Sequence, residues 1–347
     1  MLRPWIWSFL ALIVAIFSVA APAQRPADRI VAVGDLHGDH DAWVAIARAS
    51  GVVDSKGHWA GGRTTLVQVG DIVDRGPDSL KIIRDLMRLE KEAPRRGGRV
   101  IVLIGNHEAM MMTGDFRYVS AGEIAKFADR DSSRLRDMAF EANRAAIEKA
   151  YRTRTPNITP AAIRDQWFKE TPLGMLEYRR AWQPDGELGS WTLGHKAVAI
   201  VGNSLFVHGG ISADYLGLSI EEINRKVTEA LKGQDASPTS IINDPSGPLW
   251  YRGLVTRTLE DKDAATGFAR VHQGPRPTIS QEIDRVIAAY GVKRIVIGHT
   301  PSLSGIIEDS GGKLWRIDSA NSRAYGGVPS YLEIIGDRVT AHEVKRP

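Results

Sequence analysis

The chain has 347 residues, of which 43% are hydrophobic and 25% charged, and this average composition excludes disordered, low-complexity and fibrous proteins. The formal net charge is +4 without any dense basic block, so no nucleic-acid partner is expected. Since the chain has no cysteine, disulfides, zinc–thiolate sites and thiol nucleophiles are excluded, and any metal must be held by histidine, asparagine and carboxylate side chains.

Residues 1–23 have the pattern of a secretory signal peptide. One charge, Arg3, precedes an apolar run over residues 5–20, and an Ala-Pro-Ala sequence suited to a signal peptidase follows at residues 21–23. We therefore expect an exported protein, periplasmic or secreted. The alternative is a membrane anchor formed by residues 5–23, because an uncleaved apolar segment of this kind approaches the roughly 20 residues of a spanning helix. Membrane association is expected only in that second case.

Short apolar runs that end in glycine are typical of buried β-strands, and they occur at residues 29–34, 65–70, 100–105 and 294–298. Helical patterns at residues 39–50 and 77–92 separate the first three runs, so the N-terminal third is predicted to be β-α-β-α-β with a largely parallel sheet. Later strands are expected at residues 197–201, 205–208, 305–308, 314–318 and 331–335, and later helices at residues 219–232 and 280–290.

A helical insertion is predicted over about residues 115–185. Arginine, alanine and glutamate dominate from Ser132 to Arg152, and three prolines divide the region into several helices. No internal repeat or long linker is visible in residues 28–347, which are therefore predicted to form one domain that carries the insertion. The pattern alone indicates a mixed α/β fold class.

Polar side chains that can bind metal follow five of the predicted strands. They are Asp35, His37 and Asp39; Asp71, Asp74 and Arg75; Asn106, His107 and Glu108; His208; and His299. A single cluster has a structural explanation, since Asp39 can cap the following helix and a histidine at a strand end is often a hydrogen-bonded structural residue. Five clusters are harder to explain in this way, because buried polar groups cost free energy unless they are paired or bind metal.

The oxygen and nitrogen donors in these clusters suit two divalent metal ions. The expected ligands are Asp35, His37, Asp71, Asn106, His208 and His299. This donor set is compatible with Mn, Fe or Zn, with one carboxylate shared between the ions. Two such ions about 3.5 to 4 Å apart can hold a hydroxide and clamp the attacking and leaving oxygens of an in-line phosphoryl displacement. The pattern therefore favours phosphoester hydrolysis.

These motifs resemble those of the calcineurin-like metallophosphoesterases, and more closely the phosphoprotein phosphatase branch with its bacterial Shewanella-like members. The resemblance rests on Gly34-Asp35-Leu36-His37-Gly38, the segments 70–76 and 105–108, His208-Gly209-Gly210 and Gly298-His299-Thr300. Segments similar to the Shewanella-like group also occur at residues 189–191, 205–210, 248–253 and 324–327. The resemblance implies a two-sheet β-sandwich flanked by helices, with residues 28–347 as the catalytic domain.

The resemblance also implies a role for each motif residue. Asp35 and His37 would bind the first metal, Asp71 would bridge both metals, and Asn106, His208 and His299 would complete the second site. The general acid that protonates the leaving oxygen would be His107, held by Asp74. Phosphoryl oxygens would be bound by Arg75 and Arg252, with Asn106 as a further substrate contact, because a forked guanidinium matches phosphate bidentately.

Other residues near the motifs are given structural roles. Glu108 is expected to support the third loop instead of binding metal. Surface or structural positions are expected for His40, His58, His195, His272 and His342. Pro301 stands where many superfamily members have a second metal-binding histidine, which favours the phosphoprotein phosphatase arrangement over nuclease-like members. Residues 319–322 match the loop that lines the substrate groove of relatives only loosely, so no substrate contact is assigned there.

The leading functional hypothesis is a dimetal phosphatase that acts on phosphomonoesters, with phosphorylated proteins or peptides, or a small phosphoester, as substrate. A second hypothesis is hydrolysis of nucleotides or dinucleoside polyphosphates, which predicts a base-sized pocket between the insertion and the strand-end loops. A third, a non-catalytic metal- or phosphate-binding protein, is disfavoured because a pure binder needs no proton donor such as His107. The sequence predicts neither the identity of the metals nor the oligomeric state.

Overall fold

The computed structural model describes residues 28–346, except for residues 258–259, 263–268 and 272–275. The predicted leader at residues 1–23 and the predicted surface residue His272 lie outside the described residues. Among the helices of the described ranges, none is both long enough and apolar enough to cross a membrane.

The first of two five-stranded sheets contains the predicted N-terminal strands and has the order β12-β11-β1-β2-β3. Its strands are β1 (Arg29–Val33), β2 (Thr65–Gln68), β3 (Arg99–Val102), β11 (Ser330–Ile335) and β12 (Arg338–Glu343). As predicted, β1, β2 and β3 are parallel, while β11 pairs antiparallel with both β1 and β12. The edge strand β12 was not predicted, because its alternating exposed residues form no apolar run.

The second sheet has the order β4-β5-β8-β10-β9. Its strands are β4 (Val198–Val201), β5 (Ser204–Val207), β8 (Arg294–Ile297), β9 (Ile307–Asp309) and β10 (Leu314–Arg316). The three inner strands are parallel and the two edge strands are antiparallel to their neighbours. A separate short hairpin joins β6 (Glu260–Lys262) to β7 (Ala269–Val271).

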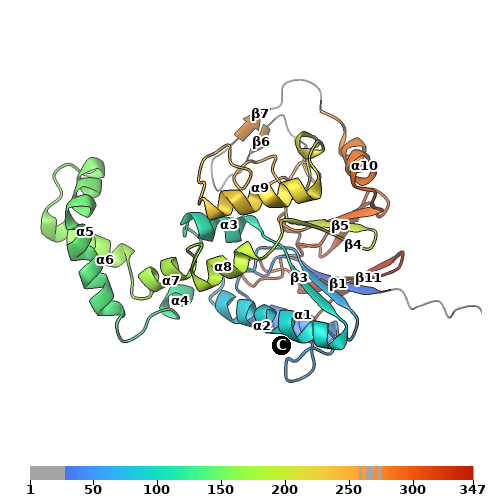
Figure 1. Ribbon diagram of the computed structural model, residues 1–347, viewed down its shortest axis with the longest axis horizontal. Coiled ribbons are helices and arrows are strands. Elements are labelled where there is room, and N and C mark those ends of the chain that lie inside the picture. Colours follow the sequence, from blue (N-terminus) through green and yellow to red (C-terminus); the bar gives the residue numbers. More distant parts are fainter. Residues whose placement is uncertain (1–27, 258–259, 263–268, 272–275, 347) are drawn as a thin grey trace, which may run out of the picture.

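An apolar core lies between the two sheets, and helices cover their outer faces (Figure 1). Val67 and Leu332 of the first sheet pack in one cluster with Phe206 and Val296 of the second. The covering helices are α1 (His40–Ala49), α2 (Ser79–Glu92), α9 (Ile220–Lys232) and α10 (Ile279–Tyr290). The two-sheet α/β sandwich implied by the family resemblance is thus confirmed.

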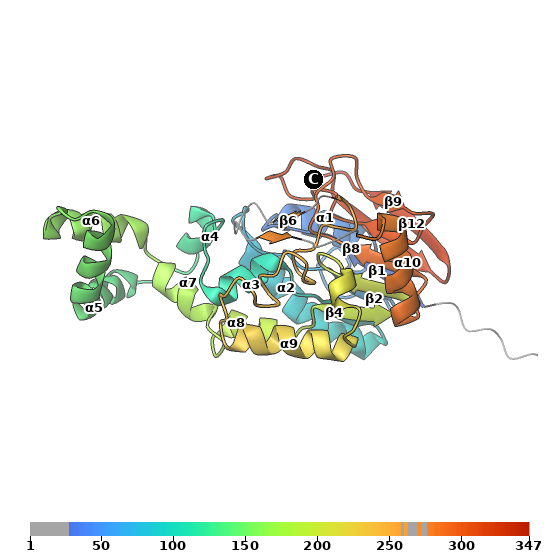
Figure 2. The ribbon, with the colours of Figure 1, turned by 90° about the horizontal axis from the view of Figure 1, so that it is seen from above.

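The region predicted to be a helical insertion contains most of the remaining helices. The remaining helices are α3 (Asn106–Thr113), α4 (Ala121–Ala125), α5 (Ser132–Arg154), α6 (Pro160–Glu170), α7 (Met175–Ala181) and α8 (Glu187–Leu193), of which α4 to α7 lie within residues 115–185. Two short 3₁₀ turns occur at Ala93–Arg96 and Ala213–Tyr215. Figures 1 and 2 show α5 and α6 projecting far from both sheets, with α4 and α7 at the base of this arm. The arm holds its own small aromatic cluster, in which Phe140 contacts Trp167 and Phe168.

The glycines at the ends of the predicted strands allow the loops that follow them to pack closely. Gly70 has a φ of +98°, and a Cβ atom at this position would lie 2.5 Å from the backbone nitrogen of Gly105. A side chain is excluded there, both by this contact and by the left-handed backbone. The loop after β2 can therefore lie directly against the loop after β3, and the polar residues of the two loops are brought together.

Candidate metal centre

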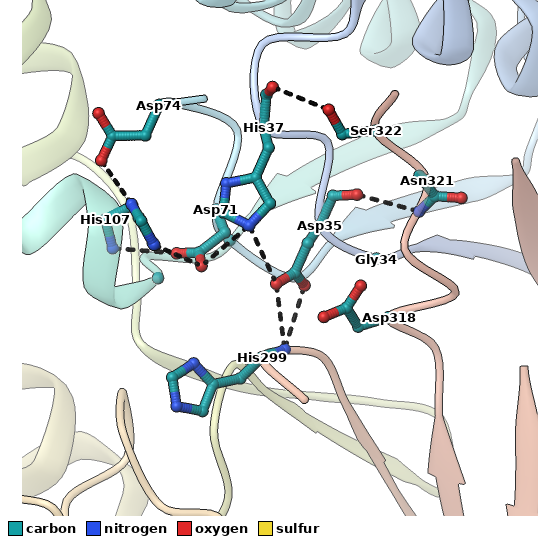
Figure 3. Close-up of polar contacts among 12 residues, drawn as sticks. Gly34, Asp35, His37, Asp71, Asp74, His107, His299, Asp318, Asn321 and Ser322 are labelled. Atoms are coloured by element: carbon teal, nitrogen blue, oxygen red, sulfur yellow. Dashed lines mark hydrogen bonds and ion pairs between the residues drawn. The ribbon is translucent and has the colours of Figure 1, made fainter. Parts of the chain in front are cut away.

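The structure gathers all six expected ligands at one edge of the sandwich, and each is almost fully buried. One carboxylate oxygen, Asp71 Oδ2, lies 3.7 Å from His37 Nε2 and 3.3 Å from His208 Nε2. Asp35 Oδ2 lies 3.8 Å from the same His37 nitrogen. Figure 3 shows Asp71 between His107 on one side and His37 with Asp35 on the other. Two donor groups share Asp71, one with His37 and His107 and the other with His208 and His299, and within each group the atoms lie within 4.8 Å of one another.

Backbone carbonyl groups orient the three predicted histidine ligands. Nδ1 of His37 bonds to Val73 O at 3.0 Å, and Nδ1 of His208 bonds to Val69 O at 2.9 Å. In His299 the Nε2 atom bonds to Trp250 O at 3.1 Å. Because a carbonyl oxygen can only accept, each of these nitrogens carries the proton, and the other ring nitrogen keeps its lone pair. This is the arrangement found behind metal-bound histidines.

A contact between Asn106 and His208 points to a cation in the same place. Asn106 Oδ1 lies 2.9 Å from His208 Nε2, the nitrogen whose lone pair is free when Nδ1 donates to Val69. Two lone pairs that face each other at this distance repel unless a proton or a cation lies against both. A divalent ion bound by Asn106 and His208 would remove that repulsion.

The pKa shifts of the buried site residues are also those expected of a site that binds cations. Burial, followed by the nearby His107, lowers the pKa of His37 to about 3, so its imidazole is neutral at neutral pH and able to bind metal. Burial, followed by Asp318 and Asp71, raises the pKa of Asp35. Three buried carboxyl groups thus share a small volume, and bound cations would relieve the repulsion among them. The residues present therefore fit a dimetal centre.

His107 and Asp74 form a second unit beside the ligands. Asp74 Oδ2 accepts a short hydrogen bond from His107 Nδ1, and Asp71 Oδ1 accepts the backbone N–H of His107 at 3.0 Å. Burial disfavours the charged imidazole, but the charge of Asp71 and the bond and charge of Asp74 outweigh it and raise the pKa of His107 to about 8. His107 Nε2 lies 3.8 Å from Asp71 Oδ2, so a protonated nitrogen faces the ligand cluster.

The two predicted phosphate-binding arginines are held in different ways. The Arg75 guanidinium lies 3.8 Å from the ring centre of Tyr118 and 5.8 Å from that of Tyr325, and the Arg75 backbone N–H donates to Tyr118 O. Arg252 Nη1 donates to His299 O at 2.6 Å and to Thr300 Oγ1 at 3.1 Å. Among the described residues no carboxylate forms an ion pair with Arg75, so it is not a surface salt bridge and is available to an anion.

The loops that carry these residues are braced and strained. Glu108 accepts the backbone N–H groups of Asp71, Ile72 and Gly105, so it supports the loops as predicted and does not point into the ligand cluster. Positive φ angles between 41° and 72° occur at five site residues, namely His37, Asp71, Asp74, Arg75 and His299. Such angles cost roughly 1–3 kcal/mol each in non-glycine residues, and they aim the side chains at a common point.

Sequence reasoning missed a second layer of residues behind the first loop. Asp318 follows β10, is buried, and raises the pKa of the neighbouring Asp35 carboxyl group. Asn321 Nδ2 donates to Asp35 O at 3.0 Å, and Ser322 Oγ donates to His37 O at 3.3 Å (Figure 3). The loop at residues 319–322 therefore positions the first predicted ligands. Asp318 stands at the end of a predicted strand, as the other clusters do, so the same pattern could have identified it.

The remaining predicted residues have structural roles. Asp39 caps α1 by accepting the backbone N–H of Ala42 at 3.0 Å. Each of the described non-motif histidines has a structural partner: His40 bonds to Asp85, His58 to Glu92 and His195 to Glu90, and His342 stacks on Tyr331.

Comparisons with known proteins agree with this geometry. Residues 28–303 match the model of the calcineurin-like phosphoesterase family. Shewanella-like protein phosphatase 2 of Arabidopsis thaliana is 32% identical over 321 residues, which cover 90% of this chain and 76% of that protein. Shewanella-like protein phosphatase 1 of Plasmodium berghei is 26% identical and covers 90% of this chain and 73% of that one. The solved cold-active protein-tyrosine phosphatase of a psychrophilic Shewanella species shares the fold, with a TM-score of 0.63 and 24% identity over 92% of this chain and 81% of that one.

Proposed function

Because the chain belongs to the calcineurin-like phosphoesterase family, we propose that this metal-dependent phosphatase hydrolyses phosphate monoesters on the side chains of proteins or peptides. The observation that carries the proposal is the position of Asp71. Its carboxylate lies among ligand atoms from both sheets, and its other oxygen accepts the backbone N–H of His107. One residue thus joins the ligand cluster to the proton donor.

In this proposal Asp35 and His37 would hold one ion, Asn106, His208 and His299 would hold the other, and Asp71 would serve both. Mn, Fe and Zn all accept such ligands, and the two ions would supply an activated water and neutralise charge on the phosphoryl group. The carbonyl groups of Val73, Val69 and Trp250 keep the three imidazoles in the tautomer that binds metal.

The chain's own residues then bind the phosphoryl group and move one proton. Arg75 and Arg252 bind phosphoryl oxygens, with Asn106 beside them. The bond from phosphorus to the ester oxygen breaks as a water oxygen bonds to phosphorus. This water releases one proton to solvent and keeps the other on the phosphate, and solvent later returns a proton to His107. His107 gives its Nε2 proton to the departing oxygen, and Asp74 stabilises the imidazolium before the transfer. The products are inorganic phosphate and the free hydroxyl group.

A protein substrate is supported by the relatives, since those from Arabidopsis thaliana and Plasmodium berghei are both named as protein phosphatases. The test is to compare kcat/KM of the metal-loaded enzyme on phosphoserine, phosphothreonine and phosphotyrosine peptides with that on ATP and diadenosine tetraphosphate. We expect the phosphopeptides to be preferred by at least about tenfold. A preference for the nucleotides would contradict the proposed substrate class while leaving the phosphatase activity intact.

We also propose that the protein acts outside the cytoplasm, because of the signal-peptide pattern in residues 1–23. Expression of the full chain in a bacterial host, followed by cell fractionation and N-terminal sequencing, tests this. Recovery from the periplasm with an N-terminus near residue 24 is the expected result. Recovery of an uncleaved chain in the membrane fraction would favour the anchor formed by residues 5–23.

A further inference from the structure

A cavity of about 900 Å³, here called the groove, is lined by residues of the edge strands β3 and β4. None of the six proposed metal ligands lines this groove. Its walls are β3, β4, the segment that leads into α9, and the end of α10. The strands β3 and β4 are labelled close together in Figure 1. Both strands are outermost in their sheets, so each has one side that pairs with no other strand.

Among the described parts of the chain, the outer edge of β3 is hydrogen-bonded only at its end. Arg99 and Leu103 donate their backbone N–H groups inward, to Thr64 and Gln68. Because these groups alternate in direction along a strand, those of Val100 and Val102 point outward to the groove. The next outward group, Ile104 N–H, donates to Lys196 O and joins the two sheets. A stretch of strand edge is therefore open just before this junction.

At the start of β4, a side chain forms hydrogen bonds with the backbone groups of the strand edge that has no neighbouring strand. Asn224 of α9 accepts the backbone N–H of Val198 and donates to its carbonyl oxygen, both at 2.9 Å. Asn224 thus forms with Val198 the pair of hydrogen bonds that the backbone of a neighbouring strand would form. The next residue with the same direction is Ile200, and its side chain is 41% exposed. The groove therefore presents open backbone groups on both walls beside an exposed apolar side chain.

The charges along the β3 wall are positive. Arg99 and Lys196 are exposed, and no carboxylate among the described residues forms an ion pair with either. The lining also contains two acidic residues: Glu90 has its two oxygens engaged by Trp191 Nε1 and His195 Nε2, and Glu221 lies on the wall formed by the start of α9. Lys196 forms an isolated bridge with Leu103, which is four residues after Arg99 along the strand. The two cationic residues, Arg99 and Lys196, therefore lie at the two ends of the open edge.

We propose that this groove binds an extended acidic segment of a partner protein, which adds a strand to the edge of β3. Backbone groups of the segment would pair with Val100 and Val102, an apolar side chain would contact Ile200, and acidic side chains four residues apart would face Arg99 and Lys196. Strand addition of this kind takes its affinity from main-chain hydrogen bonds and its specificity from alternate side chains. The proposal concerns partner recognition and does not depend on the substrate of the metal centre.

The test measures binding of a defined peptide to the metal-loaded full chain by fluorescence anisotropy. The probe is a seven-residue peptide with glutamate at its second and sixth positions, valine at its fourth and threonine elsewhere. The first comparison peptide has lysine in place of both glutamates, and the second has proline in place of valine. We expect binding of each comparison peptide to be at least about tenfold weaker, because one repels the cations and the other cannot complete the strand.

Variants then locate the binding on the protein. Ile200→Asp and Arg99→Glu are each expected to weaken binding of the glutamate peptide by about tenfold or more. The matched control Leu303→Asp, at a side chain 72% exposed outside the groove, is expected to leave it unchanged. Hydrolysis of p-nitrophenyl phosphate by all three variants is expected to match the parent enzyme, which shows that they fold.

Several outcomes would overturn the proposal. They are equal affinity for the glutamate and lysine peptides, no binding of any peptide, and unchanged binding in both groove variants. A second copy of the chain is the competing occupant. If the parent protein is a dimer in solution and Ile200→Asp converts it to a monomer, the groove is a self-association surface and the partner proposal is wrong.

Discussion

The two sheets contribute unequally to the metal centre. The loops after β1 and β2 and the start of α3, all on the first sheet, carry Asp35, His37, Asp71, Asp74, Arg75, Asn106 and His107. The second sheet carries His208 after β5 and His299 after β8. The proposed proton donor, the proposed shared carboxylate and one of the phosphate-binding arginines therefore all lie on one sheet, and the other sheet supplies the imidazoles of His208 and His299.

The two sheets also differ in the hydrogen bonds that hold their loops. On the first sheet Glu108 accepts backbone N–H groups from two neighbouring loops, which ties the residues after β2 to those after β3. On the second sheet a carbonyl oxygen orients each imidazole, that of Val69 for His208 and that of Trp250 for His299, and the backbone of His299 is also tied to Asp35 and Arg252. His107 and Asp71 are therefore joined through the loops of the first sheet, whereas His208 and His299 reach the site from separate loops of the second.

The largest effect is expected at the residue that both sheets contact. Asp71→Asn removes the negative charge that lies among imidazoles of both sheets, so both ions should be lost and kcat/KM should fall by at least about 10⁴-fold. Metal content by elemental analysis, alongside p-nitrophenyl phosphate turnover, measures this. Asp337→Asn, at an exposed surface carboxylate, serves as the control. Full metal content in Asp71→Asn would show that Asp71 is not shared between the ions.

A change confined to the first sheet should separate chemistry from metal binding. His107→Asn removes the proton donor but none of the six proposed ligands, so turnover should fall by roughly 10² to 10⁴ with the metal content intact. The loss should be greater on phenyl phosphate than on p-nitrophenyl phosphate, because the poorer leaving group depends more on protonation. An equal loss on both esters would contradict the role of His107 as general acid.

The two arginines offer a direct comparison between the sheets. Arg75 stands on the first sheet between two tyrosine rings, whereas Arg252 is tied to His299 and Thr300 of the second. Arg75→Lys should lower kcat/KM by about 10²-fold, and Arg252→Lys by about tenfold, because part of the Arg252 fork is already engaged. Steady-state kinetics on one phosphopeptide measures both. A greater loss in Arg252→Lys would reverse the proposed division between the sheets.

The sequence predicted which residues meet but not how they are held. Asp35 and Asp71 follow apolar runs of one sheet, so the rule that parallel strands end at one edge places them together, whereas His208 lies on the other sheet and only the family resemblance placed it with them. The left-handed backbone at Asp74 and the tyrosine stacking of Arg75 depend on tertiary contacts, and no local pattern encodes them. The contacts by which the insertion reaches the first sheet also depend on tertiary structure, and no local pattern in the insertion encodes them.

Tyr118 and Glu123 show how the insertion braces the first sheet. Tyr118 accepts the backbone N–H of Arg75, and Glu123 accepts the first N–H groups of α2, those of Ser79 and Leu80. Nothing in the sequence of residues 115–125 distinguishes them from an ordinary surface loop and helix. This link gives the last and smallest prediction, which concerns stability.

Burial raises the pKa of Glu123 from 4.5 to about 7, although Lys126 and the two backbone donors oppose the shift. The folded protein then binds the carboxyl proton more tightly than the unfolded chain does. The protonated Glu123 carboxyl group therefore contributes stability that is fully present below pH 4.5 and is lost as the pH rises through 7, with a total of about 3 kcal/mol. Glu123→Gln keeps a neutral acceptor at the same place, so the difference in unfolding free energy between pH 5 and pH 8 should be smaller in the variant, as measured by urea denaturation. The exposed Glu343→Gln should keep the parent profile, and a parent-like profile in Glu123→Gln would show that Glu123 is ionised throughout this range and braces α2 as a charged cap.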